Sequence, residues 1–433
     1  MMAKKLLLFF LFFSFPAAAG ETLSLCPDLQ DVSKIPADLR FLEQVQLGED
    51  GWMFSKRDTG KVPPLSPVTQ DYLERFSAAL RARGTVLVIA NVPNRIFIGR
   101  DYADSAIRQL TKYQAGISEA AFSARLAQIR TVGILAPDIL AGLAAHPLEG
   151  DFFYRRDHHW TAAGAERTAA EVAAALHASP SFMALPPREF PLRQTGTEPY
   201  TGYYGRLLQR VCHTDVPPED LPQYQSTEAA TGDLLGDAPV PSVVLVGTSF
   251  SRNEGRDRFN FAGALRHYLK QDVLNMAVAG GGFAASILSY IGSDSFAAHV
   301  PAVLVWEVPG EYDLNRDLLY RQLVPAVAGV CATAPAKMQL AGRTKIFSSA
   351  AGEQISARDY LVLEPDNPAP GKFALGLSYA GGQTEQVELE HSTRTGASGK
   401  YFLEIGRTGL SEIWMEDGSY VSGAISVRLC RGG

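Results

Sequence analysis

Hydrophobic residues follow two different patterns in the two parts of the chain. Between residues 71 and 308, short apolar runs alternate with stretches of helical spacing. Apolar strands that alternate with helices indicate an α/β fold, with a parallel sheet flanked by helices on both faces. The spacing predicts helices over 71–83, 115–130, 162–176, 261–269 and 284–291, and buried strands over 85–90, 132–135, 243–246, 273–277 and 302–308.

After residue 315 the pattern changes to short alternating runs separated by Gly, Asn and Asp. The alternation predicts strands over 373–379, 384–389, 401–405 and 424–429, and no helix is expected in this part. A small all-β sandwich fits this pattern. We therefore expect an α/β domain over 20–314 and a C-terminal β-sandwich over 315–433.

The N-terminus has the features of an export signal. Lys4 and Lys5 precede an apolar run over 6–15 that only Ser14 interrupts, and the small residues 17–19 follow. The run is too short to span a bilayer, and no later segment approaches the roughly 18 apolar residues that a span requires. We expect a signal peptide over 1–19 and a mature chain that is soluble and exported.

Composition excludes several classes of protein. The chain has 433 residues, of which 46% are hydrophobic, so it can bury a sizeable core and is not disordered. Its 40 Lys and Arg against 46 Asp and Glu give a net charge of -6, and we expect no nucleic-acid role. No Walker motif is present and the glycines 280–282 do not match G-x-G-x-x-G, so no nucleotide cofactor is implied.

The chain has four cysteines. Since we expect it in an oxidising compartment, the cysteines should form disulfides. Three connectivities are possible. The wide gap between Cys212 and Cys331 favours Cys26 with Cys212 and Cys331 with Cys430. A zinc site is the alternative, and the lack of any C-x2-C spacing argues against it.

A candidate nucleophile follows one of the predicted buried strands. The run 243–246 leads into Gly247-Thr248-Ser249, which places Ser249 just past the carboxyl end of a strand, where parallel sheets bind ligands. The glycine allows a tight turn, and the following backbone amides can serve as oxyanion donors. The alternative is that Ser249 or Ser251 only caps a turn.

A candidate base and its orienting carboxylate lie upstream. In an extended segment Asp157 and His159 share one side, so they can converge on Ser249 while His158 points away. The alternative is a metal pair or a surface histidine. Adjacent histidines diverge in a strand and no other histidine has ligand spacing, so no metal site is expected. Asn275 and Gly281 are further candidates for oxyanion donors, although plain turn chemistry also explains them.

Several motifs together carry a resemblance to a known family. They are Gly48 to Phe54, Asp157 to Thr161, Gly247 to Ser251, Asn260 to Leu265 and Leu304 to Pro309. With them the chain resembles the SGNH-hydrolase-like alginate O-acetyltransferases of the AlgJ and AlgX type, and the sandwich and cysteine pattern favour the AlgX branch. The D-x-H motif precedes G-T-S-x-S, which is the reverse of the order in ordinary SGNH hydrolases.

The resemblance implies a periplasmic enzyme that O-acetylates mannuronate residues of an exported exopolysaccharide. Ser249 would be the nucleophile, His159 the base and Asp157 its orienting residue. An acetyl donor would be required but no cofactor, and the partners would be an anionic polysaccharide and other components of an acetylation and export complex. The alternatives are a carbohydrate acetylesterase with the same three residues and a non-catalytic polysaccharide-binding scaffold.

The same resemblance suggests that the sandwich is a carbohydrate-binding module. Basic and aromatic side chains in and near it could hold a polyuronate through carboxylate pairing and sugar stacking. Each of them taken singly is also explained as solvated surface charge or, for the tryptophan, as a core residue. These candidates are Lys372, Lys400, Arg343, Arg394 and Trp414.

Overall fold

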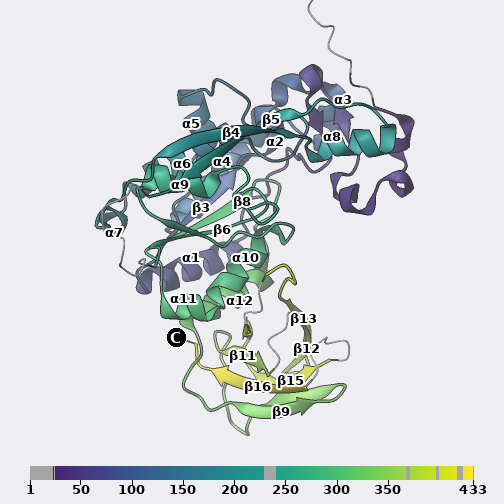
Figure 1. Cartoon of the computed structure of the whole chain (residues 1–433). Coiled ribbons are helices and arrows are strands. Elements are labelled where there is room, and N and C mark those ends of the chain that lie inside the picture. The colour runs from purple at the N-terminus through teal and green to yellow at the C-terminus, as the bar shows by residue number, and fades with distance from the viewer. Residues whose placement is uncertain are drawn as a thin grey trace, which may run out of the picture.

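The structure is a computed structural model that describes residues 23, 25–228, 240–366, 371–395, 399–416 and 423–432. Its elements form an α/β body and an all-β part below it (Figure 1). The predicted signal peptide, residues 1–19, lies outside the described residues. None of the helices in these ranges has the length and apolar character that crossing a bilayer requires.

The centre of the body is a four-stranded parallel sheet in the order β3–β8–β6–β7. Its strands are β3 (Val86–Val92), β6 (Val243–Val246), β7 (Val273–Asn275) and β8 (Val303–Pro309). Every residue of β6 and β8 is buried, which explains why both segments are nearly continuous apolar runs. The expected strand over 132–135 is wrong, because this segment contributes only a single bridge between Leu135 and Val88.

Helices cover both faces of the sheet, as predicted. They are α1 (Pro67–Ala82), α4 (Ile117–Thr131), α6 (Ala162–Leu176), α9 (Phe261–Leu269), α10 (Gly282–Ile291) and α12 (Asp317–Ala328). In Figure 1, α6 and α9 pack together on one face, and α1, α10 and α12 pack together on the other. Thr161 caps α6, since its side chain accepts a hydrogen bond from the Gly164 N–H.

Helix α12 corrects the expectation that no helix follows residue 315. It contains Pro325, which removes a backbone donor from the helix interior. Leu319, Tyr320 and Leu323 recur at helical spacing and are buried in the core of the body. Burial of this apolar face against α1 and α10 stabilises the helix despite the proline.

The C-terminal part is a β-sandwich, as predicted, and consists of two antiparallel four-stranded sheets. The sheet orders are β10–β15–β12–β13 and β14–β11–β16–β9. Inward side chains such as Leu375, Leu403 and Ile413 form a core of their own. The strands are β9 (Ala336–Leu340), β10 (Thr344–Ser348), β11 (Tyr360–Pro365), β12 (Lys372–Tyr379), β13 (Thr384–Glu390), β14 (Tyr401–Glu404), β15 (Leu410–Met415) and β16 (Gly423–Cys430).

The sandwich is joined to the body by apolar and charged contacts. Strand β14 packs on α12, and Phe402 of this strand belongs to the core of the body. Arg75 of α1 forms an ion pair with the buried Glu404. A truncated chain that ended near Asp313 would lose α12 and expose the apolar side of α1. Single substitutions therefore test the function of the sandwich better than a deletion of the whole sandwich.

Both disulfides have the predicted pairing, Cys26 with Cys212 and Cys331 with Cys430. The second joins the segment after α12 to the last strand of the sandwich. The first joins the N-terminal 3-10 turns to the segment after α8 (Tyr203–Leu207). These two segments share a small apolar core of their own, so this disulfide fastens the N-terminal segment to α8.

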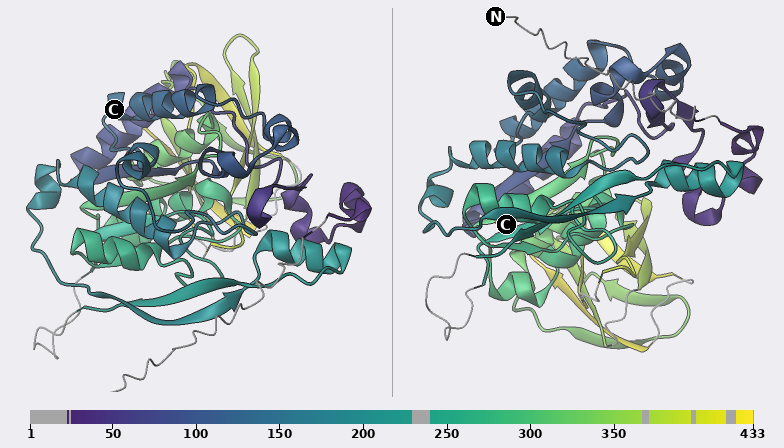
Figure 2. Two further views of the ribbon diagram at one scale, coloured as in Figure 1. Left: turned by 90° about the horizontal axis from the view of Figure 1, so that it is seen from above. Right: turned by 45° about the horizontal axis from the view of Figure 1, so that its top comes forward.

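A two-stranded ribbon, β4 (Leu192–Tyr200) with β5 (Glu219–Ser226), lies along α9, and α8 follows one end of it (Figure 2). Most side chains of β4 are exposed, so the sequence carries no alternation that predicts it. The remaining elements are short. They are α2 (Arg95–Ile98), α3 (Ser105–Thr111), α5 (Ile139–Ala145), α7 (Pro180–Met183), α11 (Asp294–Ala298), β1 (Gln46–Leu47) and β2 (Met53–Phe54).

Candidate active site

Ser249 lies in a tight turn directly after β6, at the carboxyl end of the sheet. The turn requires a glycine at its first position, because a Cβ on Gly247 would lie 2.5 Å from Oε2 of Glu307. The Gly247 N–H donates to Oγ of Ser286 over 2.8 Å. The strand end and α10 therefore fix the backbone that presents Ser249.

Glu307 of β8 holds this turn through hydrogen bonds from three donors. Its Oε2 accepts hydrogen bonds from the Thr248 N–H at 2.7 Å and from Oγ of Ser251 at 2.9 Å, and its carboxylate also accepts from Oγ1 of Thr248. The side chain is fully buried, and burial raises the pKa of Glu307 to about 7, although the three donors oppose this shift. Ser251 thus bonds to Glu307, whereas Ser249 does not.

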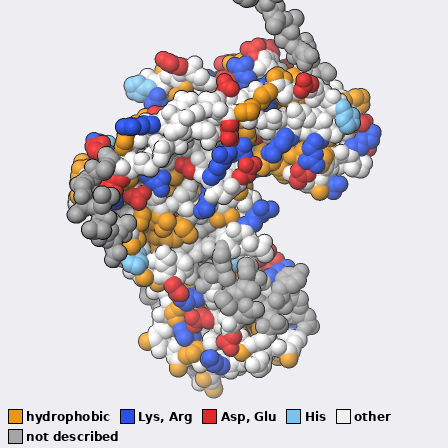
Figure 3. All heavy atoms as spheres, in the orientation of Figure 1, with side chains coloured by type: hydrophobic (Ala, Val, Ile, Leu, Met, Phe, Trp, Pro, Cys, Tyr) orange, Lys and Arg blue, Asp and Glu red, His pale blue; other side chains and the backbone are white. Residues whose placement is uncertain are grey.

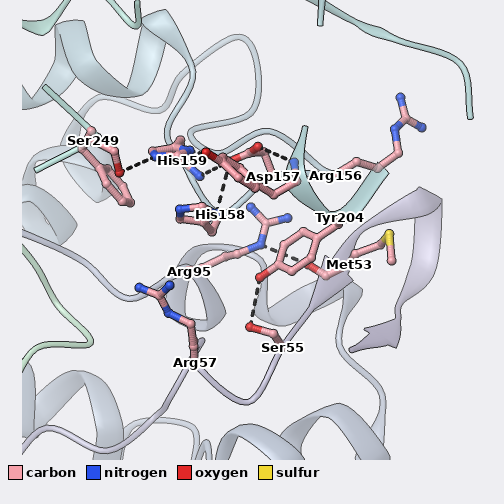
Figure 4. Close-up of polar contacts among 12 residues, drawn as sticks. Met53, Ser55, Arg57, Arg95, Arg156, Asp157, His158, His159, Tyr204 and Ser249 are labelled. Atoms are coloured by element: carbon pink, nitrogen blue, oxygen red, sulfur yellow. Dashed lines mark hydrogen bonds and ion pairs between the residues drawn. The ribbon is translucent and has the colours of Figure 1, made fainter. Parts of the chain in front are cut away.

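A chain of hydrogen bonds joins Ser249 to two buried side chains (Figure 4). Nε2 of His159 lies 2.8 Å from Oγ of Ser249, and Nδ1 lies 2.6 Å from Oδ1 of Asp157. Oδ2 of Asp157 accepts from Oη of Tyr200 and from the Tyr203 N–H, both at 2.7 Å. Every polar group of this chain has a partner, which fixes the imidazole ring between carboxylate and hydroxyl.

Asp157 is ionised in this setting. Burial alone would raise its pKa, but the electrostatic attraction to His159 and the hydrogen bonds from His159 outweigh that effect and hold the pKa far below its usual range. A buried carboxylate that accepts from Nδ1–H directs Nε2 of His159 toward Ser249 as a proton acceptor. The arrangement can therefore deprotonate the serine hydroxyl.

The expectation that His158 points away is wrong. Residues 155–159 form a turn and bends rather than an extended strand, so the period of two does not apply. The rings of His158 and His159 lie 3.9 Å apart, and Nδ1 of His158 is 3.5 Å from Oδ1 of Asp157. Burial lowers the pKa of His158 well below its ordinary value, and the His159 charge adds to this, so a neutral ring packs against His159.

The ligand atoms of Asp157, His158 and His159 lie within 4.8 Å of one another, so a metal ion is a conceivable occupant. The earlier reason for excluding one, divergence of the two histidines, does not hold. However, both oxygens of Asp157 accept protein hydrogen bonds, and both ring nitrogens of His159 contact protein oxygens. These contacts favour a protein-bonded arrangement over a metal centre.

The two weaker oxyanion candidates lie on the side of the turn near the sandwich. The amide of Asn275 donates to the Ser251 carbonyl at 3.0 Å and accepts from the Ala277 N–H at 3.0 Å, so it braces the loop after β7. Gly281 precedes α10, and a Cβ there would lie 3.8 Å from Oγ of Ser392 in the sandwich. An oxyanion role for either residue stays a prediction.

The five predicted substrate-binding residues do not gather in one place. Arg343 stacks on Trp414 at 4.2 Å on the outer face of the sandwich. Lys372 pairs with Glu388, also on the sandwich, and Lys400 pairs with Asp294 of α11. Arg394 faces the body, since a Cβ on Gly280 would lie 3.0 Å from its guanidinium carbon.

Sequence reasoning missed several residues that build the site. Tyr200, Tyr203 and Glu307 orient Asp157 or the serine turn, and Trp160 joins the two segments by donating from Nε1 to the Phe250 carbonyl at 2.9 Å. Trp160 and Glu307 stand in the motifs Asp157 to Thr161 and Leu304 to Pro309, so a signal existed for them. Nothing in the local pattern indicates the two tyrosines.

A serine at the carboxyl end of a parallel sheet, together with a buried histidine and carboxylate, defines an SGNH-hydrolase-like α/β protein, here with an added β-sandwich. The chain belongs to the family described as "SGNH hydrolase-like domain, acetyltransferase AlgX", whose model matches residues 45–310. The alginate biosynthesis protein AlgX of Pseudomonas putida is 28% identical over 407 residues, which are 90% of this chain and 84% of that protein.

Other relatives match the body alone or the whole fold. The probable alginate O-acetylase AlgJ of Pseudomonas syringae pv. tomato is 33% identical over 279 residues, 62% of this chain and 68% of that protein. The structure of Pseudomonas aeruginosa AlgX superposes with a TM-score of 0.79 at 24% identity and covers 94% of this chain and all of that one. The latter likeness establishes the fold of both domains.

Proposed function

We propose that this protein is an O-acetyltransferase that transfers acetyl groups to hydroxyls of alginate or an alginate-like polyuronate in the periplasm. The observation that carries the proposal is the hydrogen-bonded chain from Asp157 through His159 to Ser249. Membership of the acetyltransferase AlgX family supports the reaction, and the relatives' names support the substrate. The predicted signal peptide and the two disulfides fit an oxidising compartment.

In the first half-reaction, Nε2 of His159 accepts the proton of Ser249 as its Oγ attacks the carbonyl carbon of an activated acetyl ester. A bond forms between Oγ and that carbon, the bond to the leaving group breaks, and His159 gives the proton to the leaving group. Asp157 stabilises the imidazolium that forms in between. The product is an acetyl-serine.

The tetrahedral intermediate carries a negative charge beside Ser249. The N–H groups on either side donate within the protein, from Thr248 to Glu307 and from Phe250 to Oγ1 of Thr248. The Ser249 N–H donates to no residue in the described part of the chain. It is therefore available to the oxyanion, and the turn that Glu307 braces preorganises it.

In the second half-reaction a sugar hydroxyl gives its proton to His159 as its oxygen attacks the acetyl carbon. The bond between that carbon and Oγ of Ser249 breaks, and His159 returns the proton to Oγ. Water in the same position would hydrolyse the intermediate. Transfer therefore requires that the polysaccharide be bound with its hydroxyl at high effective concentration.

Two alternatives give different products. An acetylesterase would use the same three residues but release acetate, and a polysaccharide-binding scaffold would need none of them. The protein should be incubated with an activated acetyl ester, with and without polyuronate. NMR detection of acetyl groups on the polymer supports transfer, acetate alone indicates an esterase, and neither product indicates a scaffold.

A cavity of about 500 Å³ between body and sandwich is a candidate site for the acceptor. It is lined by Arg252 from the segment after Ser249, by residues 276–279 after β7, and by Arg394 from the sandwich. Neither arginine forms an ion pair with a described residue, although Arg252 donates to the backbone carbonyls of Gly255 and Asn275. Two guanidinium groups without a carboxylate partner suit the carboxylates of a polyuronate, which gives the sandwich a role in transfer.

We expect Arg394→Gln to raise the KM for polyuronate about tenfold, because the variant loses one charge-assisted hydrogen bond to the polymer. Turnover of a small acetyl ester should not slow. Lys372→Gln is the matched control, because Lys372 pairs with Glu388 on the sandwich. Initial rates over a range of polymer concentrations measure both effects. Equal KM values for the two variants would remove this cavity from the acceptor site.

The two histidines should differ sharply when each is replaced by phenylalanine. His159→Phe removes the proton acceptor and should lower ester turnover by about 10⁴-fold. His158→Phe keeps a neutral ring against His159, Phe41 and Tyr203, so turnover should stay within about threefold of the parent protein. A loss in the His158 variant as large as in the His159 variant would show that His158 moves a proton.

A further inference from the structure

Arg206 of α8 is held flat against an aromatic ring close to the candidate active site. Its guanidinium carbon lies 4.1 Å from the ring centre of Tyr203, one helical turn earlier. Its Nε is buried without a hydrogen-bond partner, and the guanidinium forms no ion pair with a residue in the described ranges. The group is thus positioned by stacking. Its charge helps to lower the pKa of Asp38, but that carboxylate accepts its hydrogen bond from Arg210 instead.

Three other arginines near α8 differ from Arg206 in this respect. Each of the three has a carboxylate within ion-pair distance, and those distances are 3.1, 3.5 and 2.7 Å. Such pairs make these side chains poor receptors, since a ligand would have to displace the protein carboxylate. The pairs are Arg57–Glu311, Arg156–Glu219 and Arg210–Asp38.

Tyr203 connects Arg206 to the catalytic groups. Its backbone N–H donates to Oδ2 of Asp157, and its ring centre lies 5.9 Å from that of His159. Tyr200 gives a second indication that Arg206 lies near the catalytic groups. Burial, followed by the Asp157 charge, raises the pKa of Tyr200 well above its ordinary value, and the charges of Arg258 and then of Arg206 oppose this shift.

The surface near Arg206 suits an anionic chain. In Figure 3, basic side chains gather over α8 and along the rim of the hollow between the upper part of the molecule and the sandwich. Phe41 stands edge-on to Tyr203 with ring centres 5.3 Å apart, and it also contacts His158. An aromatic wall with a cation at its edge matches the ring and the carboxylate of a uronic acid.

We propose that Arg206, stacked on Tyr203, binds the carboxylate of the uronate residue that accepts the acetyl group. The inference rests on the proposed function and names the group of the substrate that is recognised. A planar guanidinium can bind a carboxylate through two parallel hydrogen bonds, and stacking has already restricted its rotation. Arg206 therefore selects polyuronates over neutral polymers of the same sugar geometry.

The test compares Arg206→Gln with Arg210→Gln by calorimetric binding of a uronate oligomer and of the same oligomer after reduction of its carboxyl groups. Arg210 is the matched control, since it lies four residues further along and is paired with Asp38. We expect Arg206→Gln to weaken uronate binding about tenfold and to leave binding of the reduced oligomer unchanged. Arg210→Gln should change uronate affinity less than twofold.

Other results would overturn the proposal. They are unchanged uronate affinity in Arg206→Gln, equal losses for the charged and the reduced oligomer, equal losses in both variants, and no binding of the oligomer to the parent protein. Acetyl transfer is measured separately on the parent protein. Arg206-dependent binding without acetylation of the oligomer would contradict the proposed function while supporting carboxylate recognition by Arg206.

Discussion

Ser249→Ala should abolish the acetyl-enzyme and lower acetyl transfer by roughly 10⁴- to 10⁶-fold. The substitution removes the oxygen that lies 2.8 Å from Nε2 of His159, and no other described hydroxyl is bonded to that nitrogen. Intact-mass spectra after exposure to an activated acetyl ester should show one added acetyl group on the parent protein and none on the variant. Ser249 lies in a turn and makes no other side-chain hydrogen bond within the described residues, so the fold should persist.

Ser251→Ala is the matched control for the nucleophile. Oγ of Ser251 donates to Glu307, so this variant should lose about 1 kcal/mol of stability but keep the acetyl-enzyme. Near-ultraviolet circular dichroism and thermal unfolding confirm that both variants are folded. One acetyl group on Ser249→Ala, located by peptide mapping on another residue, would remove Ser249 from the mechanism.

How well the fold could be predicted depends on how much of each element is buried. The segments 162–176, 243–246 and 261–269 have the bounds that their patterns predict, because burial on one or both sides determines their residues. Strand β4 exposes most of its side chains and was not predicted. Helix α12 was missed because Pro325 interrupts a pattern that only tertiary packing completes.

The candidate site was predictable where a residue's own chemistry marks it. Asp157, His159 and Ser249 could be proposed together because a nucleophile needs a base and the base needs a carboxylate, even though the assumed extended backbone is wrong. The groups that orient them come from distant segments: Tyr203 lies between the two strands of the ribbon and Glu307 lies in β8. Such contacts depend on the three-dimensional arrangement of these segments, so local spacing does not indicate them, although Glu307 stands in one of the motifs that carry the resemblance.

Replacement of Glu307, which is buried under the serine turn, should strongly lower the free energy of unfolding. Glu307→Ala leaves the Thr248 N–H and the hydroxyls of Thr248 and Ser251 without their acceptor, and it opens a cavity below the turn. Each buried unsatisfied group costs about 1–3 kcal/mol, so the free energy of unfolding should fall by at least about 3 kcal/mol. Denaturant unfolding of this variant beside Glu307→Gln, which keeps an acceptor oxygen, measures the difference. Equal stabilities would mean that the carboxyl oxygens do not hold the turn.

The same residue should make stability depend on pH. Burial raises the pKa of Glu307 from an ordinary value of 4.5 to about 7, so the folded protein retains this proton when the unfolded chain has lost it. Its contribution is complete below pH 4.5 and is lost as the pH rises through about 7, a loss of about 2–3 kcal/mol between pH 5 and 8. Asp257, whose burial raises its pKa to about 6, acts in the same direction, so the parent protein needs a reference. Glu307→Gln provides it, because glutamine carries no titrating proton: its unfolding free energy should fall less over this range and exceed that of the parent protein at pH 8. Parallel pH profiles for the two proteins would show that Glu307 is already ionised at pH 5.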